Sequence, residues 1–138
     1  MNNHSIAYPA PVRSDINAPL LDAWSRGELA LQQCTACMHK VYFPRTLCPH
    51  CWSSELECKP LSGKGTIVSH SRIHKHVHAA FMHEPPTLLA EILLDEGWSM
   101  LARVVVPEGV SVSSGMRVEL VPRTEALRFP LPTFALGE

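Results

Sequence analysis

The sequence predicts a mainly β protein in which a short N-terminal helix and a small metal-held ribbon precede a five-stranded barrel. Four of the five cysteines form two Cys-x-x-Cys pairs, Cys34/Cys37 and Cys48/Cys51, with ten residues between the pairs. Beyond Cys58 the chain changes to short runs of β-forming residues separated by glycine-containing turns. At 138 residues, the chain has the length of one ordinary domain, or of two small ones if a metal holds one of them.

The cysteine pairs predict a closed metal site. Each Cys-x-x-Cys turn directs two thiolates at one point, and two such turns supply four sulfur ligands for a tetrahedral ion. We expect zinc, with iron as the minor alternative. Because all four positions are sulfur, none is left for water or substrate, which favours a structural over a catalytic ion. Two disulfides or free core thiols are the alternative, and the short paired spacing and the lack of an export signal weigh against it.

We divide the chain into an N-terminal arm and helix (1–28), a zinc ribbon (29–58) and a barrel with a C-terminal tail (59–138). Within the first part, a short helix is expected from Ala18 to Glu28, with Asn17 as its cap. A lone helix of this length is marginal in water, so its apolar stripe must pack on the rest of this chain, on a partner subunit or on a ligand tail. The candidate partner contacts are the residues of that stripe, Leu20, Leu21 and Trp24.

The ribbon is expected to contain a strand from Leu29 to Gln33 and a return strand from Lys40 to Phe43. The ribbon has too few residues to build a core of its own. The metal must therefore supply much of its folding free energy, and structural zinc contributes ~10–16 kcal/mol in peptide systems. Cys58 lies outside the ligand spacing, and we expect it to be a small buried apolar side chain.

The barrel is expected from strands separated by turns at Gly63–Gly65 and Asp95–Gly97 and by a polar loop from Pro107 to Gly115. Five short strands in about seventy residues suit a small barrel. The expected strands are Thr66–His74, Thr87–Leu94, Trp98–Val106, Met116–Pro122 and Leu131–Leu136.

Charge and hydropathy disfavour several functions. Twelve Lys and Arg residues against 13 Asp and Glu residues leave a net charge of -1, which disfavours a protein that neutralises many phosphates. No apolar run approaches the ~20 residues of a membrane span, so we expect no membrane span and a cytoplasmic location.

A histidine run is the one pattern that could indicate catalysis. His74, His76 and His78 would share one face if a strand continued through them, and three imidazoles can bind a metal. No carboxylate follows at ligand spacing, so a solvated strand end is the alternative, as is a basic patch for a phosphorylated ligand that adds Arg72 and Lys75. No phosphate-binding loop or nucleophile elbow occurs, and Glu84 and the other acids of the barrel are expected to be solvated. We therefore assign no catalytic residue.

The order of these parts resembles the zinc-ribbon OB-fold family of acyl-CoA-associated proteins. The resemblance covers about residues 18–136 and is carried by the two cysteine pairs, by Phe43-Pro44-Arg45 between them, and by the Leu61–Ile67 segment with its Ser-Gly-Lys-Gly-Thr run. It implies a rubredoxin-like ribbon followed by an OB-fold. Members of this family resemble accessory subunits of thiolase-like enzymes, or partners of hydratases and aldolases acting on CoA thioesters.

We therefore expect a subunit that is not an enzyme alone, and that binds acyl-CoA, docks on a thiolase-like or hydratase-like enzyme, or does both. The phosphates of CoA need cations, and the candidates are Arg72, Lys75, Arg103 and Arg123. The alternative is a zinc-ribbon/OB protein that binds single-stranded nucleic acid through aromatics and basic grooves, although the charge balance disfavours nucleic acid as a partner. An enzyme in its own right is a third class, supported by the histidine run alone.

Overall fold

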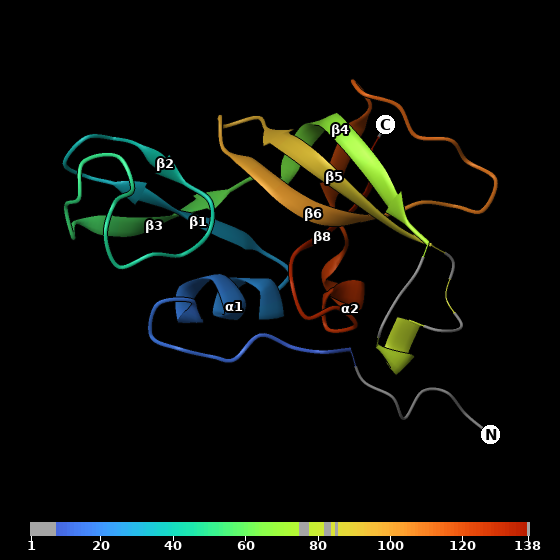
Figure 1. Cartoon of the computed structure of the whole chain (residues 1–138), viewed down its shortest axis with the longest axis horizontal. Helices are drawn as coiled ribbons and strands as arrows, with labels where there is room; N and C mark the ends of the chain where they lie inside the picture. The colour runs from blue at the N-terminus through green and yellow to red at the C-terminus, as the bar shows by residue number, and fades with distance from the viewer. Residues whose placement is uncertain (1–7, 75–77, 82–83, 85, 138) are drawn as a thin grey trace.

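The computed structural model describes residues 8–74, 78–81, 84 and 86–137. A three-stranded ribbon lies beside a barrel, and the two helices lie together on one side of them (Figure 1). The elements in chain order are α1 (Ala18–Ser25), β1 (Leu29–Cys34), β2 (Lys40–Val41), β3 (Leu56–Leu61), β4 (Lys64–Ile73), the 3₁₀ turn η2 (Ala79–Phe81), β5 (Thr87–Leu94), β6 (Ser99–Val105), β7 (Arg117–Leu120), α2 (Arg123–Ala126) and β8 (Thr133–Leu136).

The ribbon is an antiparallel sheet in the order β2-β1-β3. β1 pairs with β3 along its whole length, from Leu29 opposite Leu61 to Cys34 opposite Leu56. Strand β3 was not predicted, because Glu57, Lys59 and Pro60 are poor strand formers. They are tolerated here because β3 lies at the edge of the sheet.

The barrel is closed by five strands in the order β4-β5-β6-β8-β7, which confirms the predicted fold class. β6 and β8 run parallel, and the other neighbouring pairs are antiparallel. β5 has the predicted bounds, and alternate residues along it point into the core: Leu88, Ala90, Ile92 and Leu94 are buried. The outer face of β5 therefore presents Leu89 and Leu93 away from the core.

The ribbon and the barrel share one hydrophobic core. Leu29 and Leu31 of β1 belong to the same cluster as Ile92 and Phe134 of the barrel. The indole nitrogen of Trp98 donates to the carbonyl of Gln32 at 2.8 Å. The base of the ribbon is thus built into the barrel.

Helix α1 is shorter than predicted. It ends at Ser25, and the chain turns at Gly27, whose φ of 73° lies in the left-handed region that glycine adopts readily. A side chain at Gly27 would also meet the Cβ of Arg123 at 2.7 Å. Asn17 does not cap the helix as expected. Its side chain instead bonds Ser14 and Val12 in the preceding turn.

The rest of this chain covers most of the apolar stripe of α1. Leu20 and Trp24 are buried, and the indole nitrogen of Trp24 donates to the carbonyl of Phe129 at 2.8 Å. Leu21 stays half-buried. Of the three candidate partner contacts, Leu21 is therefore the one that keeps a free surface.

Helix α2 was not predicted. It is one turn long, and its buried Ala126 joins Trp24, Val121 and Phe129 in a second small cluster. Over the described residues, neither helix has the length and apolar character needed to cross a membrane.

Candidate metal site and apolar cavity

The four paired cysteines form a compact sulfur cluster. Their Sγ atoms all lie within 4.8 Å of one another, with 3.6 Å between Cys34 and Cys51 and 3.7 Å between Cys37 and Cys48. Four sulfurs bound to one tetrahedral ion at 2.3 Å stand about 3.8 Å apart. The arrangement therefore fits a zinc or iron ion, and it leaves no position for substrate.

Both cysteine pairs have the same backbone conformation. Met38 donates its N–H to the carbonyl of Cys34 at 2.8 Å, and Trp52 donates to that of Cys48 at 2.9 Å. Met38 and Trp52 each have a φ of 67°. This left-handed conformation costs a residue with a side chain roughly 1–2 kcal/mol. Each turn directs its two thiols to the same side, which is why two short motifs suffice to build the site.

Hydrogen bonds from backbone N–H groups lower the pKa of two of the four thiols. The N–H of Cys37 lowers the pKa of the Cys34 thiol. At Cys48 burial acts in the opposite direction, but the N–H groups of Cys51 and His50 outweigh it and lower the pKa to about 7. At Cys37 the N–H of His39 lowers the pKa, yet burial and the neighbouring sulfurs raise it to about 12. Four adjacent thiolates therefore need a cation among them.

Cys58 is exposed, so the expectation of a buried side chain is wrong. It lies on edge strand β3 opposite Gln32. Because β3 was not predicted, its solvent-facing side was not foreseen.

The structure brings two of the four candidate cations together. Arg72, at the end of β4, and Arg103, on β6, both line a hollow of about 650 Å³ beside the 107–111 loop, here called the arginine hollow. Arg123 begins α2 and lies at a different hollow, next to Gly27. Lys75 lies outside the described residues.

His74 and His78, the two described histidines of the predicted run, do not share a strand face. β4 ends at Ile73, His74 follows it, and His78 precedes η2, where its Nδ1 accepts the N–H of Ala80 at 3.0 Å. His76 lies outside the described residues. Within the described part of the chain, the four cysteines are the one group of ligating side chains close enough to hold a metal.

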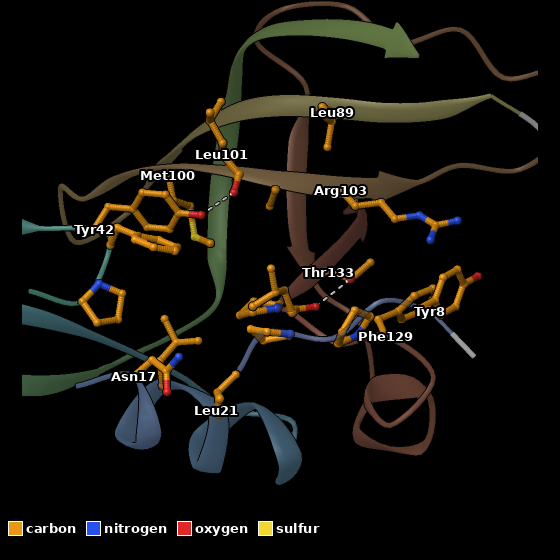
Figure 2. A pocket seen from close by; sticks show the side chains of 18 of the residues that line it. Tyr8, Asn17, Leu21, Tyr42, Leu89, Met100, Leu101, Arg103, Phe129 and Thr133 are labelled. Atoms are coloured by element: carbon orange, nitrogen blue, oxygen red, sulfur yellow. Dashed lines mark hydrogen bonds between the residues drawn. The ribbon is translucent and has the colours of Figure 1, made fainter. Parts of the chain in front are cut away.

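An apolar cavity of about 290 Å³, which sequence reasoning missed, lies between α1 and the outer faces of β5 and β6. Figure 2 shows Leu21, Tyr42, Leu101 and Phe129 around it. Further walls come from the Phe43-Pro44 turn of the ribbon and from residues 129–133. No single stretch of sequence signals the cavity, because its walls come from separate parts of the chain.

One end of the cavity carries a polar cluster. Arg103 bonds Glu84 at 2.9 Å, and the hydroxyl of Tyr8 donates to the other oxygen of the same carboxylate. The guanidinium also lies over the rings of Tyr8 and Phe129, 5.4 and 5.1 Å from their centroids. Burial is the main cause that raises the pKa of Tyr8. Glu84 was expected to be solvated, and this expectation is wrong because the carboxylate is paired and half-buried.

Comparison with known proteins follows the same division into ribbon and barrel. The ChsH2 rubredoxin-like zinc ribbon domain matches residues 21–57, and the ChsH2 C-terminal OB-fold domain matches residues 59–123. The chain belongs to this family. The expected rubredoxin-like ribbon and OB-fold are thereby confirmed, and the zinc ribbon match supports a metal site at the four cysteines.

Two curated relatives are DUF35 domain-containing scaffold proteins. The one from Pyrococcus furiosus is 33% identical over 85 residues, which are 62% of each chain. The one from Methanocaldococcus jannaschii is 38% identical over 85 residues, which are 60% of each chain. The chain thus spans about three fifths of the length of the curated relatives it matches.

Two solved structures are similar over most of the chain. A chain of the Ltp2-ChsH2(DUF35) aldolase is 28% identical with a TM-score of 0.73, and the match covers 91% of this chain and 98% of that one. A DUF35 protein of unknown function from Sulfolobus solfataricus is 12% identical with a TM-score of 0.62, covering 90% and 87%. The second likeness supports the fold alone.

Proposed function

We propose that this chain is a non-catalytic accessory subunit that docks on a thiolase-like or hydratase-like enzyme acting on CoA thioesters, and that it contributes to acyl-CoA binding. The observation that carries the proposal is the likeness, over 91% of the chain, to a chain of the Ltp2-ChsH2(DUF35) aldolase. The scaffold proteins among its relatives support the same role. A closed four-sulfur site agrees with it, since such a site leaves no coordination position for a substrate.

The cysteine turns provide a surface suited to docking. Trp52 is 76% exposed and Met38 is 61% exposed, although both occupy left-handed positions that glycine or asparagine would fill at lower cost. Large apolar side chains at strained, solvent-facing positions are explained if a partner covers them. Tryptophan is also among the residues enriched at the energetically important positions of interfaces. We therefore place the enzyme contact on this end of the ribbon.

The ribbon is packed and hydrogen-bonded onto the barrel, so a partner bound to the ribbon would have a defined position relative to the barrel. Besides the shared core, the hydroxyl of Tyr42 donates to the carbonyl of Leu101 on β6 at 2.9 Å. A partner bound at Trp52 is thus held in a defined orientation to the apolar cavity, which Tyr42 and Leu101 both line.

The test is recovery of the tagged chain from its native host, with the proteins it retains identified by mass spectrometry. We expect a thiolase-like or hydratase-like enzyme, and we expect turnover of a CoA thioester by the complex but not by the isolated chain. Trp52→Asn removes the indole at a position where asparagine tolerates the backbone, and should lower recovery at least about fivefold. The matched control is Leu127→Asn, an exposed apolar residue next to α2.

Two results would overturn the proposal. One is recovery of the chain alone, with Trp52→Asn and Leu127→Asn indistinguishable from the unaltered protein. The other is recovery with nucleic acid only, which would assign the chain to the single-strand-binding alternative.

A further inference from the structure

Two hollows meet on the outer face of the barrel. Thr87 of β5 and Arg103 of β6 line both the apolar cavity and the arginine hollow. In the pairing of the two strands, Leu89 stands opposite Arg103. Thr87 therefore lies one diagonal step from Arg103 on the same face of the sheet. These two residues form a junction between a space of about 290 Å³ and one of about 650 Å³.

The apolar cavity is suited to a hydrocarbon chain. Leu21, Leu89 and Leu101 present aliphatic surface to it, and Leu101 is 61% exposed. Figure 2 shows these side chains facing the same space as Tyr42 and Phe129. Since a water molecule takes up about 30 Å³ of liquid, the volume corresponds to about ten atoms of that size. An acyl chain of about ten carbons matches it.

The arginine hollow is suited to an anionic head group. Arg72 is exposed, and within the described part of the chain it forms no ion pair. Arg103 is already paired with Glu84, so it orders the junction more than it attracts a second anion. Glu108 is the one carboxylate among the residues that line this hollow.

The junction carries a polar group that lacks a partner. The Oγ1 of Thr87 is buried and has no hydrogen-bond partner among the described residues. A buried hydroxyl without a partner costs free energy that a ligand oxygen at the junction would recover.

We propose that the two hollows together bind one acyl thioester, with a chain of about ten carbons in the apolar cavity, the thioester oxygen at Thr87, and the phosphorylated carrier beside Arg72. The choice of a CoA thioester rests on the proposed function. The division into an apolar and a cationic part comes from the residues that line the two spaces. A free fatty acid shares the acyl chain but has no phosphates to reach Arg72.

The test is calorimetric titration of the full metal-containing chain with decanoyl-CoA, decanoate and CoA at one ionic strength. We expect decanoyl-CoA to bind at least about tenfold more tightly than either fragment, because it alone fills both hollows. Leu101→Glu places a carboxylate in the apolar cavity and should weaken decanoyl-CoA at least about tenfold. The matched control is Leu93→Glu, a 46% exposed leucine on the same outer face of the barrel that does not line the cavity, and it should leave the affinity unchanged.

Further variants test the head-group site at Arg72 and the thioester contact at Thr87. Arg72→Gln should weaken decanoyl-CoA about threefold to tenfold and leave decanoate unchanged, whereas Arg123→Gln, outside both hollows, should change neither. Thr87→Val should raise the unfolding midpoint, since it removes an unpartnered hydroxyl, and should weaken decanoyl-CoA about threefold or more. A purely structural threonine would change the midpoint and not the affinity.

Equal binding of CoA and decanoyl-CoA would overturn the proposal, as would an unchanged affinity in a folded Leu101→Glu variant. Equal affinities for decanoate and decanoyl-CoA would show that the phosphorylated carrier does not bind beside Arg72. The recovery experiment with Trp52→Asn is independent of these titrations. If an enzyme is recovered but no acyl ligand binds, the proposed docking is supported and the proposed acyl site is wrong. If an acyl ligand binds but no enzyme is recovered, the acyl site is supported and the proposed docking is wrong.

Discussion

At the cysteine end of the ribbon, residues 34–55, most large apolar side chains are exposed, whereas the barrel encloses a core of them and keeps others, such as Leu101, on its outer face. Met38, Phe43 and Trp52 are exposed, while Ile92 and Phe134 are completely buried. The cysteine end is therefore held by its sulfur cluster and backbone bonds, and the barrel by its core. The difference shows how one short chain can leave apolar residues exposed in one region and keep a stable fold in the other.

The largest expected effect is loss of the metal. Cys48→Ser removes one of four ligands, and a structural ion of this kind contributes ~10–16 kcal/mol to folding in peptide systems. We expect less than about a tenth of an equivalent of metal in the purified variant, with fast amide exchange confined to residues 34–55. Cys58→Ser, at the exposed fifth cysteine, is the control and should retain about one equivalent. Full metal content in Cys48→Ser would show that the four-sulfur site is wrong.

The next effect comes from the barrel core. Phe134→Ala should lower the free energy of unfolding by about 3–5 kcal/mol, because it leaves a cavity where Phe134 is fully enclosed. Phe43→Ala, on the exposed turn of the ribbon, should change it by less than about 0.5 kcal/mol. Denaturant unfolding of the metal-containing chain measures both. Comparable losses in the two variants would contradict the contrast between the regions.

A smaller effect tests the link between the two regions. Trp98→Phe keeps an aromatic ring but removes the bond to the carbonyl of Gln32, which should cost about 1–3 kcal/mol. Hydrogen exchange should then speed up in β1 with little change in β5. Trp52→Phe, at an exposed tryptophan, serves as the control. If β1 and β5 lose protection equally, the bond is not a specific link between ribbon and barrel.

The smallest effect concerns the surface of the barrel. Arg117 bonds both oxygens of Asp95, at 2.7 and 2.8 Å, and these bonds lower the pKa of the Asp95 carboxyl. Because the folded pKa lies below the unfolded one, the contribution to stability is present above the unfolded pKa and is lost as pH falls through the folded pKa. Arg117→Gln should return the pKa of Asp95 toward its ordinary value in an NMR titration of the carboxyl. An unchanged pKa of Asp95 in this variant would show that the ion pair with Arg117 does not lower it.

Local patterns predicted much of the fold. The bounds of β5 and its inward-facing residues follow from period-two alternation, which belongs to the strand itself. Strand β3 and the exposed position of Cys58 were missed because β3 forms by pairing with β1, in spite of a sequence that disfavours a strand.

The candidate site divides in the same way. Two Cys-x-x-Cys spacings by themselves predicted which four sulfurs come together, since each motif closes its own turn through bonds within a few residues. The tertiary structure alone decided that Trp24 is covered by Phe129, that Glu84 pairs with Arg103, and that a cavity lies between α1 and the barrel. Those contacts join residues that lie far apart in the chain, and the physical reason is that only packing of the whole core brings such residues within reach of one another.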